Sequence, residues 1–121
     1  MMLGGRTILV TGAARGLGAE IARCLAKHGA DLVLADIAEE EGRAVAKETG
    51  ARFIPLDLGE PASIEAAAKA LGEANGGTLH GLVNNGAIAT GIGGIPFDEI
   101  DIESWDRVMQ VNVRGTWLMT R

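Results

Sequence analysis

The chain is poor in cysteine and in aromatic residues: it has one cysteine, Cys24, no tyrosine, and aromatic residues make up 3% of its 121 residues. A single cysteine excludes a disulfide within the chain and is typical of a reducing cytoplasm. Cys24 falls among apolar residues of a predicted helix, so we expect it to be buried and inert. Neither histidine, His28 or His80, has neighbours at the spacing of a metal site or a catalytic triad, so we expect no metal ion.

Long apolar runs and an excess of positive charge are also missing. The first apolar run is short and is interrupted by glycine and Arg6, which is unlike a signal peptide, and no run approaches the ~20 residues that span a membrane. The formal net charge is -5 and no basic stripe is present, which disfavours nucleic acid as a partner. These features predict a cytoplasmic protein that binds neither a membrane nor nucleic acid.

Apolar residues and glycine are plentiful instead. Hydrophobic residues make up 47% of the chain and charged residues 22%, which predicts a packed core and argues against disorder. The 18 glycines favour a fold with many tight turns. The length fits one domain and no linker or low-complexity segment divides it, so we expect no second domain.

Apolar runs of strand length alternate with segments of helical periodicity along the chain. Four strands are expected, at residues 7–10, 31–36, 51–57 and 80–85. Helices are expected at about 17–28, 38–48 and 61–74, and from 101 or 104 onward. The apolar positions of the first helix recur at helical spacing: Leu17, Ile21, Cys24 and Leu25. Buried strands alternating with helices predict an α/β fold with a doubly wound parallel sheet of the Rossmann type, in strand order 3-2-1-4.

A glycine-dense bend, "TGAARGLG", joins the first strand to the first helix. Such a bend aims free backbone N–H groups at the helix N-terminus, which suits a pyrophosphate. Gly12 permits the turn, Gly16 lets the backbone approach the ligand, and Gly18 lets the helix pack closely, with Arg15 and Leu17 as further candidate contacts. The alternative is a tight turn of small residues with no ligand. The strand before it, the helix after it and an acid downstream favour dinucleotide binding.

That acid is Asp36, which ends the second predicted strand. A carboxylate there can accept hydrogen bonds from both ribose hydroxyls of an adenosine and repels a 2′-phosphate, which favours NAD over NADP. Arg15 argues the other way, since a guanidinium in the bend could pair with a 2′-phosphate. We give Asp36 more weight because it acts on the phosphate directly, so the expected cofactor is NAD.

Polar residues also end the third and fourth predicted strands. Asp57 is either a turn residue or a contact of the adenine amino group, assisted by the backbone of Leu58, and its place at a strand's carboxyl end favours the adenine contact. Asn84 and Asn85 leave a buried strand and need partners, so they tie neighbouring loops together, touch the cofactor, or do both.

Taken together, these motifs resemble the short-chain dehydrogenase/reductase family over nearly the whole chain. "TGAARGLG" is similar to its TGxxxGxG motif, "LAD" to its NAD-selecting acid, "LDL" to its adenine contact and "LVNN" to its NNAG strand end. "WDRVMQVNVRGTW" is similar to the helix that carries an asparagine of its catalytic tetrad, here Asn112. The resemblance implies an NAD-dependent oxidoreductase that transfers hydride between nicotinamide and a secondary alcohol or ketone.

The resemblance also assigns Asn112 a role, through its backbone carbonyl and a water in a proton relay. The alternative is a helix-interior asparagine kept for packing. The resemblance further implies a homo-oligomer, a dimer or tetramer, in the complete protein. Trp105 and Trp117 lie in the last predicted helix, where we expect them to pack within the chain or across a subunit interface.

Two departures from the family pattern stand out. "NNGA" replaces Asn-Asn-Ala-Gly, so Gly86 comes one position early beside the expected cofactor. The family also works through a serine and a Tyr-x-x-x-Lys segment that follow the last predicted helix, whereas this sequence contains no tyrosine. Its two serines, Ser63 and Ser104, fall at predicted helix starts, where capping explains them.

We therefore expect residues 1–121 to be the N-terminal half of a single NAD-binding Rossmann domain. One alternative is a truncated, non-catalytic module that binds a dinucleotide. Another is an assembly half, whose open sheet edge awaits a partner.

Overall fold

The computed structural model describes residues 1–74 and 76–121 and contains a four-stranded parallel sheet in the order β3-β2-β1-β4. The strands are β1 (Thr7–Thr11), β2 (Asp31–Asp36), β3 (Arg52–Pro55) and β4 (Gly81–Val83). The helices are α1 (Gly16–Lys27), α2 (Glu39–Thr49), α3 (Pro61–Ala74), the short η1 (Phe97–Glu99), α4 (Ile102–Met109), the π-helical η2 (Gln110–Gly115) and α5 (Thr116–Thr120). The predicted α/β class and strand order are confirmed.

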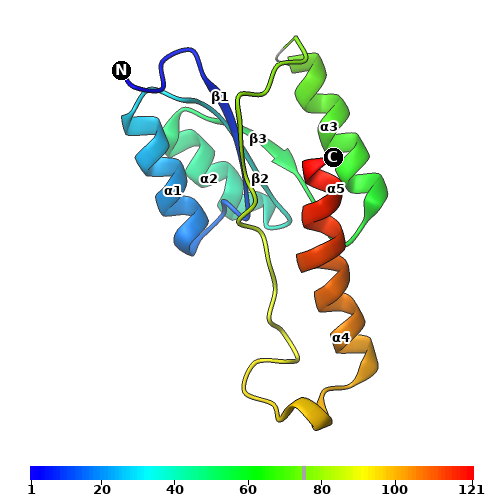
Figure 1. Cartoon of the computed structure of the whole chain (residues 1–121). Coiled ribbons are helices and arrows are strands. Elements are labelled where there is room, and N and C mark those ends of the chain that lie inside the picture. Colours follow the sequence, from blue (N-terminus) through cyan, green and yellow to red (C-terminus); the bar gives the residue numbers. More distant parts are fainter. Residues whose placement is uncertain (75) are drawn as a thin grey trace.

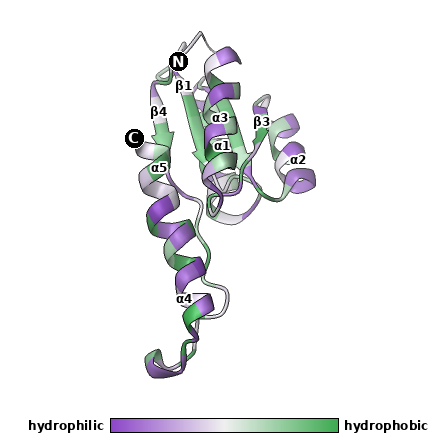
Figure 2. Cartoon of the chain, turned by 90° about the vertical axis from the view of Figure 1, so that its right-hand side faces the viewer, coloured by the Kyte–Doolittle hydropathy of each residue, from purple (hydrophilic) through white to green (hydrophobic). Residues whose placement is uncertain are grey.

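Helices cover both faces of the sheet, with α1 and α2 on one side and α3 and α5 on the other (Figure 1). Side chains along β1 alternate between the two faces, so Ile8 and Val10 pack under α1 and α2 while Leu9 packs under α3 and α5. The strands are therefore apolar on both faces, as the green arrows in Figure 2 show. This explains why they read in the sequence as unbroken aliphatic runs.

The outer strands are shorter than predicted. β3 ends at Pro55 and β4 spans only Gly81–Val83, whereas the sequence suggested strands to residues 57 and 85. The chain leaves the ladder there because the polar residues that follow bind elsewhere: Asp57 forms a turn and Asn85 reaches the end of β1. Both strands therefore deliver polar groups to one edge of the sheet.

The expected apolar face of α1 is partly wrong. Cys24 is exposed, contrary to the predicted burial, and Leu17 is 70% exposed. The helix turns Gly18, Ala19 and Ala22 toward the sheet. These small residues allow a close approach that the larger side chains at 17 and 24 would prevent, so spacing alone misplaced the buried stripe.

The two serines also differ from the capping prediction. Asp101 is the N-cap of α4, since its Oδ1 accepts a hydrogen bond from the Ser104 backbone N–H at 2.7 Å. The Ser63 hydroxyl, in the first turn of α3, accepts the backbone N–H of Asp57 at 2.9 Å. The helix that contains Ser104 is thus capped by Asp101. Ser63 instead holds the loop that precedes its own helix, α3.

Candidate functional site

A cleft of about 510 Å³ lies at the carboxyl ends of the strands. Its lining comes from the glycine bend, from the ends of β2 and β3, from the loop after β4, and from α4 and η2. The residues are Gly12, Arg15, Leu17, Gly18, Ala35, Asp36, Ile37, Leu56, Asp57, Leu58, Asn85, Gly86, Ala87, Ile88, Ala89, Thr90, Arg107 and Val111. Most candidates from the sequence therefore meet in one place.

The glycine bend has the close packing and the left-handed backbone that its sequence predicts. Gly12 and Gly16 have φ values of 66° and 57°, which disfavour any residue with a side chain. A Cβ on Gly18 would lie 2.0 Å from the Gly12 carbonyl oxygen, so α1 can pack here only with glycine. A Cβ on Gly16 would meet nothing within 4 Å, so the backbone at this position borders open space.

The N-terminus of α1 is free to meet a ligand. Its N-cap residue, Arg15, makes no side-chain capping hydrogen bond, and the first turn of the helix carries no acidic residue. The first N–H groups of a helix need acceptors, and the helix dipole makes this end favourable for an anion. Together with the open space at Gly16, this arrangement has the chemistry to hold a pyrophosphate.

Asp36 joins the bend to the start of α2. Its Oδ2 accepts the backbone N–H of Ala14 at 3.0 Å and its Oδ1 accepts that of Ala38 at 2.9 Å. Each carboxylate oxygen can accept a second hydrogen bond, so ribose hydroxyls can still bind to it. Arg15 lies 3.4 Å from the carboxylate of Glu41 in an exposed ion pair. Its guanidinium is thus turned toward an acidic residue of α2.

Asp57 is a turn residue and also lines the cleft. Its Oδ1 accepts the Gly59 backbone N–H at 2.9 Å, and its own N–H donates to Ser63. Leu58 lies between two glycines: a Cβ on Gly86 would be 2.6 Å from its Cδ1, and a Cβ on Gly115 would be 2.5 Å from its carbonyl oxygen. Asp57 thus forms a turn and lines the cleft at the same time, so its role as a turn residue does not exclude a contact with adenine.

The two asparagines after β4 point in different directions. Asn85 Nδ2 donates to the carbonyl oxygens of Thr11 and Gly12, at 3.2 and 3.1 Å, and so fixes the glycine bend. Asn84 is exposed and donates to the Thr120 hydroxyl at 3.1 Å, outside the cleft lining. Asn85 thus ties loops and lines the cleft, while Asn84 ties β4 to α5.

Gly86 gives a physical account of the "NNGA" departure. Its backbone N–H donates to the Thr11 hydroxyl at 2.9 Å, which holds the loop against the end of β1. A side chain at this position would push Leu58 away, as its 2.6 Å approach shows. The early glycine therefore leaves room for the Leu58 side chain beside it.

Asn112 holds the loop after β4 with its side chain. Its Oδ1 accepts the Ile88 backbone N–H at 2.9 Å, and its Nδ2 donates to the Ile88 carbonyl at 2.8 Å. Asn112 lies in the π-helical segment η2, and such segments are frequent at functional sites. Sequence reasoning foresaw a helix here but not the π turns.

The cleft lining also includes residues that sequence reasoning did not single out, among them Ile37, Thr90, Arg107 and Val111. Ile37 follows Asp36 and is 63% exposed, so its apolar surface in the cleft is accessible to a ligand. Arg107 and Val111 are four residues apart, so they share one side of the helix, and both line the cleft. That spacing was visible in the sequence.

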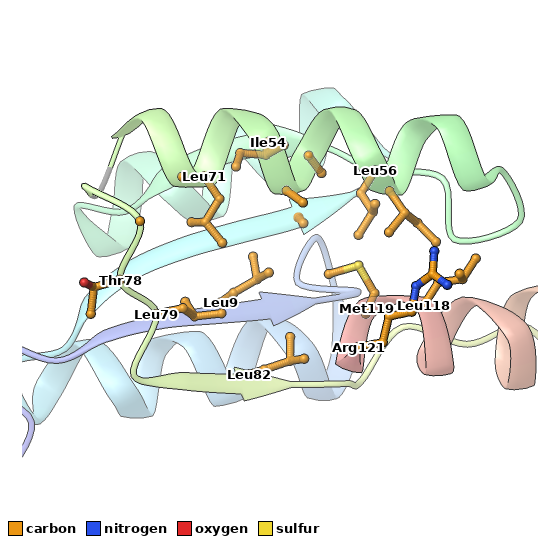
Figure 3. Close-up of a pocket in the computed structure, with 16 residues that line it drawn as sticks. Leu9, Ile54, Leu56, Leu71, Thr78, Leu79, Leu82, Leu118, Met119 and Arg121 are labelled. Atoms are coloured by element: carbon orange, nitrogen blue, oxygen red, sulfur yellow. The ribbon is translucent and has the colours of Figure 1, made fainter.

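A second hollow, of about 240 Å³, lies between α3, the sheet and α5 (Figure 3). Leu9, Leu71 and Leu82 point into it, and Arg121 is the only charged residue of its lining within the described part of the chain. Pockets for small polar ligands need a few converging polar groups, and this lining offers almost none. The described residues also contain no group of three or more His, Cys, Asp or Glu side chains fit for a metal ion.

Comparisons with known proteins agree with the geometry. A family model described as short chain dehydrogenase matches residues 6–121. A 3-alpha-(or 20-beta)-hydroxysteroid dehydrogenase of Mycobacterium tuberculosis is 42% identical over 119 residues, which are 97% of this chain and 44% of that protein. The chain thus spans less than half the length of this relative.

Two solved structures have the same fold. One is a 3-ketoacyl-(acyl-carrier-protein) reductase from Brucella melitensis complexed with NADH, with a TM-score of 0.91, 35% identity, and coverage of 98% of this chain and 48% of that one. The other is a metagenomic short-chain oxidoreductase in complex with NADP, with a TM-score of 0.89, 35% identity, and coverage of 100% and 56%. A nicotinamide dinucleotide is the common ligand, in both its phosphorylated and unphosphorylated forms.

Proposed function

Because the chain belongs to the short-chain dehydrogenase/reductase family, we propose that its cleft binds NAD in an enzyme that transfers hydride between nicotinamide and a secondary alcohol or ketone. The observation that carries the proposal is the uncapped N-terminus of α1 beside Asp36 at the carboxyl edge of the sheet. The pyrophosphate binds at this helix end, and the adenosine lies toward β2 and β3. The proposed contacts are Gly12, Arg15, Gly16, Leu17, Gly18, Asp36, Asp57, Leu58, Asn85 and Gly86.

Two arguments favour NAD over NADP. The Asp36 carboxylate lines the cleft and repels a 2′-phosphate, and the one nearby cation in the bend, Arg15, is paired with Glu41. The family likeness alone does not choose, since its members bind either form. The carboxylate is therefore the deciding group in this proposal.

Asn112 is proposed as the residue of this chain nearest to the chemical step. Its side chain is occupied by Ile88, which leaves a role for its backbone carbonyl in positioning a water. Asn84 is proposed only as a support, through Thr120. When bound, the nicotinamide supplies or accepts the hydride, and the residues here orient it and exclude water from it.

The proton that accompanies the hydride needs an acid–base group. The sequence contains no tyrosine, so we propose dinucleotide binding for these residues and turnover for the whole protein, of which they form the N-terminal half of one domain. The lack of tyrosine also favours a second candidate, a module that binds the dinucleotide without turnover. Intact mass separates them: turnover by a preparation shown to end at Arg121 contradicts the module.

The direct test is to titrate the protein with NADH and with NADPH and to measure binding by the change in cofactor fluorescence. We expect saturable NADH binding that is tighter than NADPH binding. Oxidation of secondary alcohols should then be assayed in the whole protein with NAD. The absence of any NADH binding would overturn the proposal, whereas binding without turnover would leave the module.

The complete protein is proposed to be a cytoplasmic homo-oligomer. Trp105, Met109, Val113 and Trp117 form an exposed apolar row along α4, η2 and α5, with the two tryptophans 53% and 58% exposed. Exposed rows of this kind often mark protein–protein contacts. Within the described residues, none of the helices is long and apolar enough to cross a membrane. Sedimentation with Val113→Glu as the disrupting variant tests the oligomer, and cell fractionation tests the location.

A further inference from the structure

Arg107, in α4, is a charged residue of the cleft that lies outside the glycine bend and the strand ends. The other charged lining groups already have partners: Arg15 pairs with Glu41, Asp36 accepts two backbone N–H groups, and Asp57 accepts that of Gly59. Among residues 1–74 and 76–121, the Arg107 guanidinium has no hydrogen bond, ion pair or ring contact. An arginine that lines a cleft without a protein partner is available to a ligand.

The position of Arg107 is fixed by the packing of α4 and η2. One turn further along, Val111 is buried, and its Cγ2 is 3.4 Å from where a Cβ on Gly59 would be. Gly115, one turn beyond, packs on the Leu58 backbone, and Arg114 donates to the Gly59 carbonyl at 2.8 Å. The row 107, 111, 115 therefore rests on the loop after β3, with Arg107 at its outer end.

This position belongs to the adenosine side of the cleft. The loop after β3 carries Asp57, and Ile37 follows β2, so both mark the side away from β4. In folds of this type the adenosine lies toward β2 and β3. The exposed Ile37 offers one apolar surface to a ring, and the Arg107 guanidinium is a planar group that stacks on such rings.

We propose that Arg107 forms the outer wall of the adenosine subsite, with its guanidinium against the adenine ring. This proposal rests on the proposed dinucleotide binding and adds a contact from an element outside the glycine bend and the strand ends. It gives a role to the contacts between η2 and the loop after β3, because they set the position of α4, and so of the arginine, relative to the ring.

The test measures dissociation constants of 5′-AMP, NADH, NADPH and nicotinamide mononucleotide by calorimetry for the wild type and for Arg107→Ala, Arg107→Lys and Arg6→Ala. We expect Arg107→Ala to weaken AMP and NADH binding about 2- to 30-fold, with nicotinamide mononucleotide unchanged. Arg107→Lys should recover only part of the loss, because it restores the charge without the planar group. Arg6→Ala removes the same charge just before β1, at the amino end of the strand and so away from the cleft, and should have no effect.

Several outcomes separate the proposed adenine contact of Arg107 from the broader proposal that the cleft binds a dinucleotide. Unchanged AMP affinity in Arg107→Ala, with normal NADH binding by the wild type, overturns the adenine contact alone. A loss confined to NADPH also overturns it, because the guanidinium would then be recognising a 2′-phosphate. Absence of NADH and AMP binding in the wild type overturns both. Thermal unfolding should be equal in the wild type and Arg107→Ala, because the side chain is exposed and has no partner in the described structure.

Discussion

The cleft at the strand ends and the apolar pocket beneath α3 share Ala35 and Leu56 in their walls, yet they differ in kind. The pocket is lined by residues on the face of the sheet, where strand side chains are apolar because helices cover them. The cleft is lined where the chain leaves the strands, so turns expose backbone N–H groups and polar side chains there. Position along a strand, more than cavity size, therefore decides which hollow has binding chemistry.

The largest expected effect is a loss of stability when a buried side chain of the apolar pocket is shortened. Leu9 is 4% exposed and lines the pocket, so Leu9→Ala should lower the free energy of unfolding by about 2–5 kcal/mol. NADH affinity of the folded protein should not change, because Leu9 lies outside the cleft. Urea unfolding and NADH titration measure the two quantities. Leu79→Ala, at a 37% exposed site in the same pocket, should cost about 1 kcal/mol or less, and equal costs would contradict the burial argument.

A pair of glycine substitutions sharpens the contrast. A Cβ at Gly18 meets the Gly12 carbonyl oxygen at 2.0 Å, so Gly18→Ala should cost about 1–3 kcal/mol and weaken NADH binding by about a factor of ten. Gly72 lies in α3 on the pocket, where a Cβ meets nothing within 4 Å. Gly72→Ala should stabilise the protein by about 0.5–1 kcal/mol and leave NADH binding unchanged. If the two substitutions changed stability and NADH affinity equally, the close contact of Gly18 with Gly12 would not be the cause of the effect.

A smaller effect is expected at Asp36, where the cleft carries charge. Asp36→Asn keeps an acceptor for a backbone N–H but removes the negative charge. NADH affinity should fall about tenfold and the preference over NADPH should narrow, as measured by titration with both. Asp36→Ala should also lose stability, because the N–H groups of Ala14 and Ala38 then lack their acceptor. Unchanged NADH affinity in Asp36→Asn would mean that the carboxylate does not contact the ribose.

The smallest effect concerns pH and a residue, Asp101, that lines neither the cleft nor the apolar pocket. The Ser104 backbone N–H, followed by its hydroxyl, lowers the pKa of Asp101 below its ordinary value. A lowered pKa stabilises the fold above the unfolded carboxyl's pKa, and this contribution is lost as pH falls through the folded value, at strongly acidic pH. Asp101→Ala should therefore have a slightly lower melting temperature than the wild type at pH 7. The difference should shrink in acid, and a constant difference would contradict the linkage.

Much of this arrangement was predictable from local patterns. The glycine bend and the acid at the end of β2 are visible within short stretches of the sequence. The strand order follows from the alternation of buried strands and helices along the chain. Cys24 and Leu17 were misplaced because close packing through Gly18, Ala19 and Ala22 decides the buried side of α1, and side-chain size outweighs periodicity there. The bonds between Asn112 and Ile88 join segments 24 residues apart, so no local pattern reveals them.

The two hydrogen bonds that Asp36 accepts also matter to anyone who wishes to redesign the cofactor preference. The same carboxylate that would meet the ribose also fastens the glycine bend to the start of α2. Selectivity and local architecture are therefore coupled in one side chain. A successful redesign toward the phosphorylated cofactor would need a second substitution that restores acceptors for Ala14 and Ala38, and single-site libraries at this position should yield few active members.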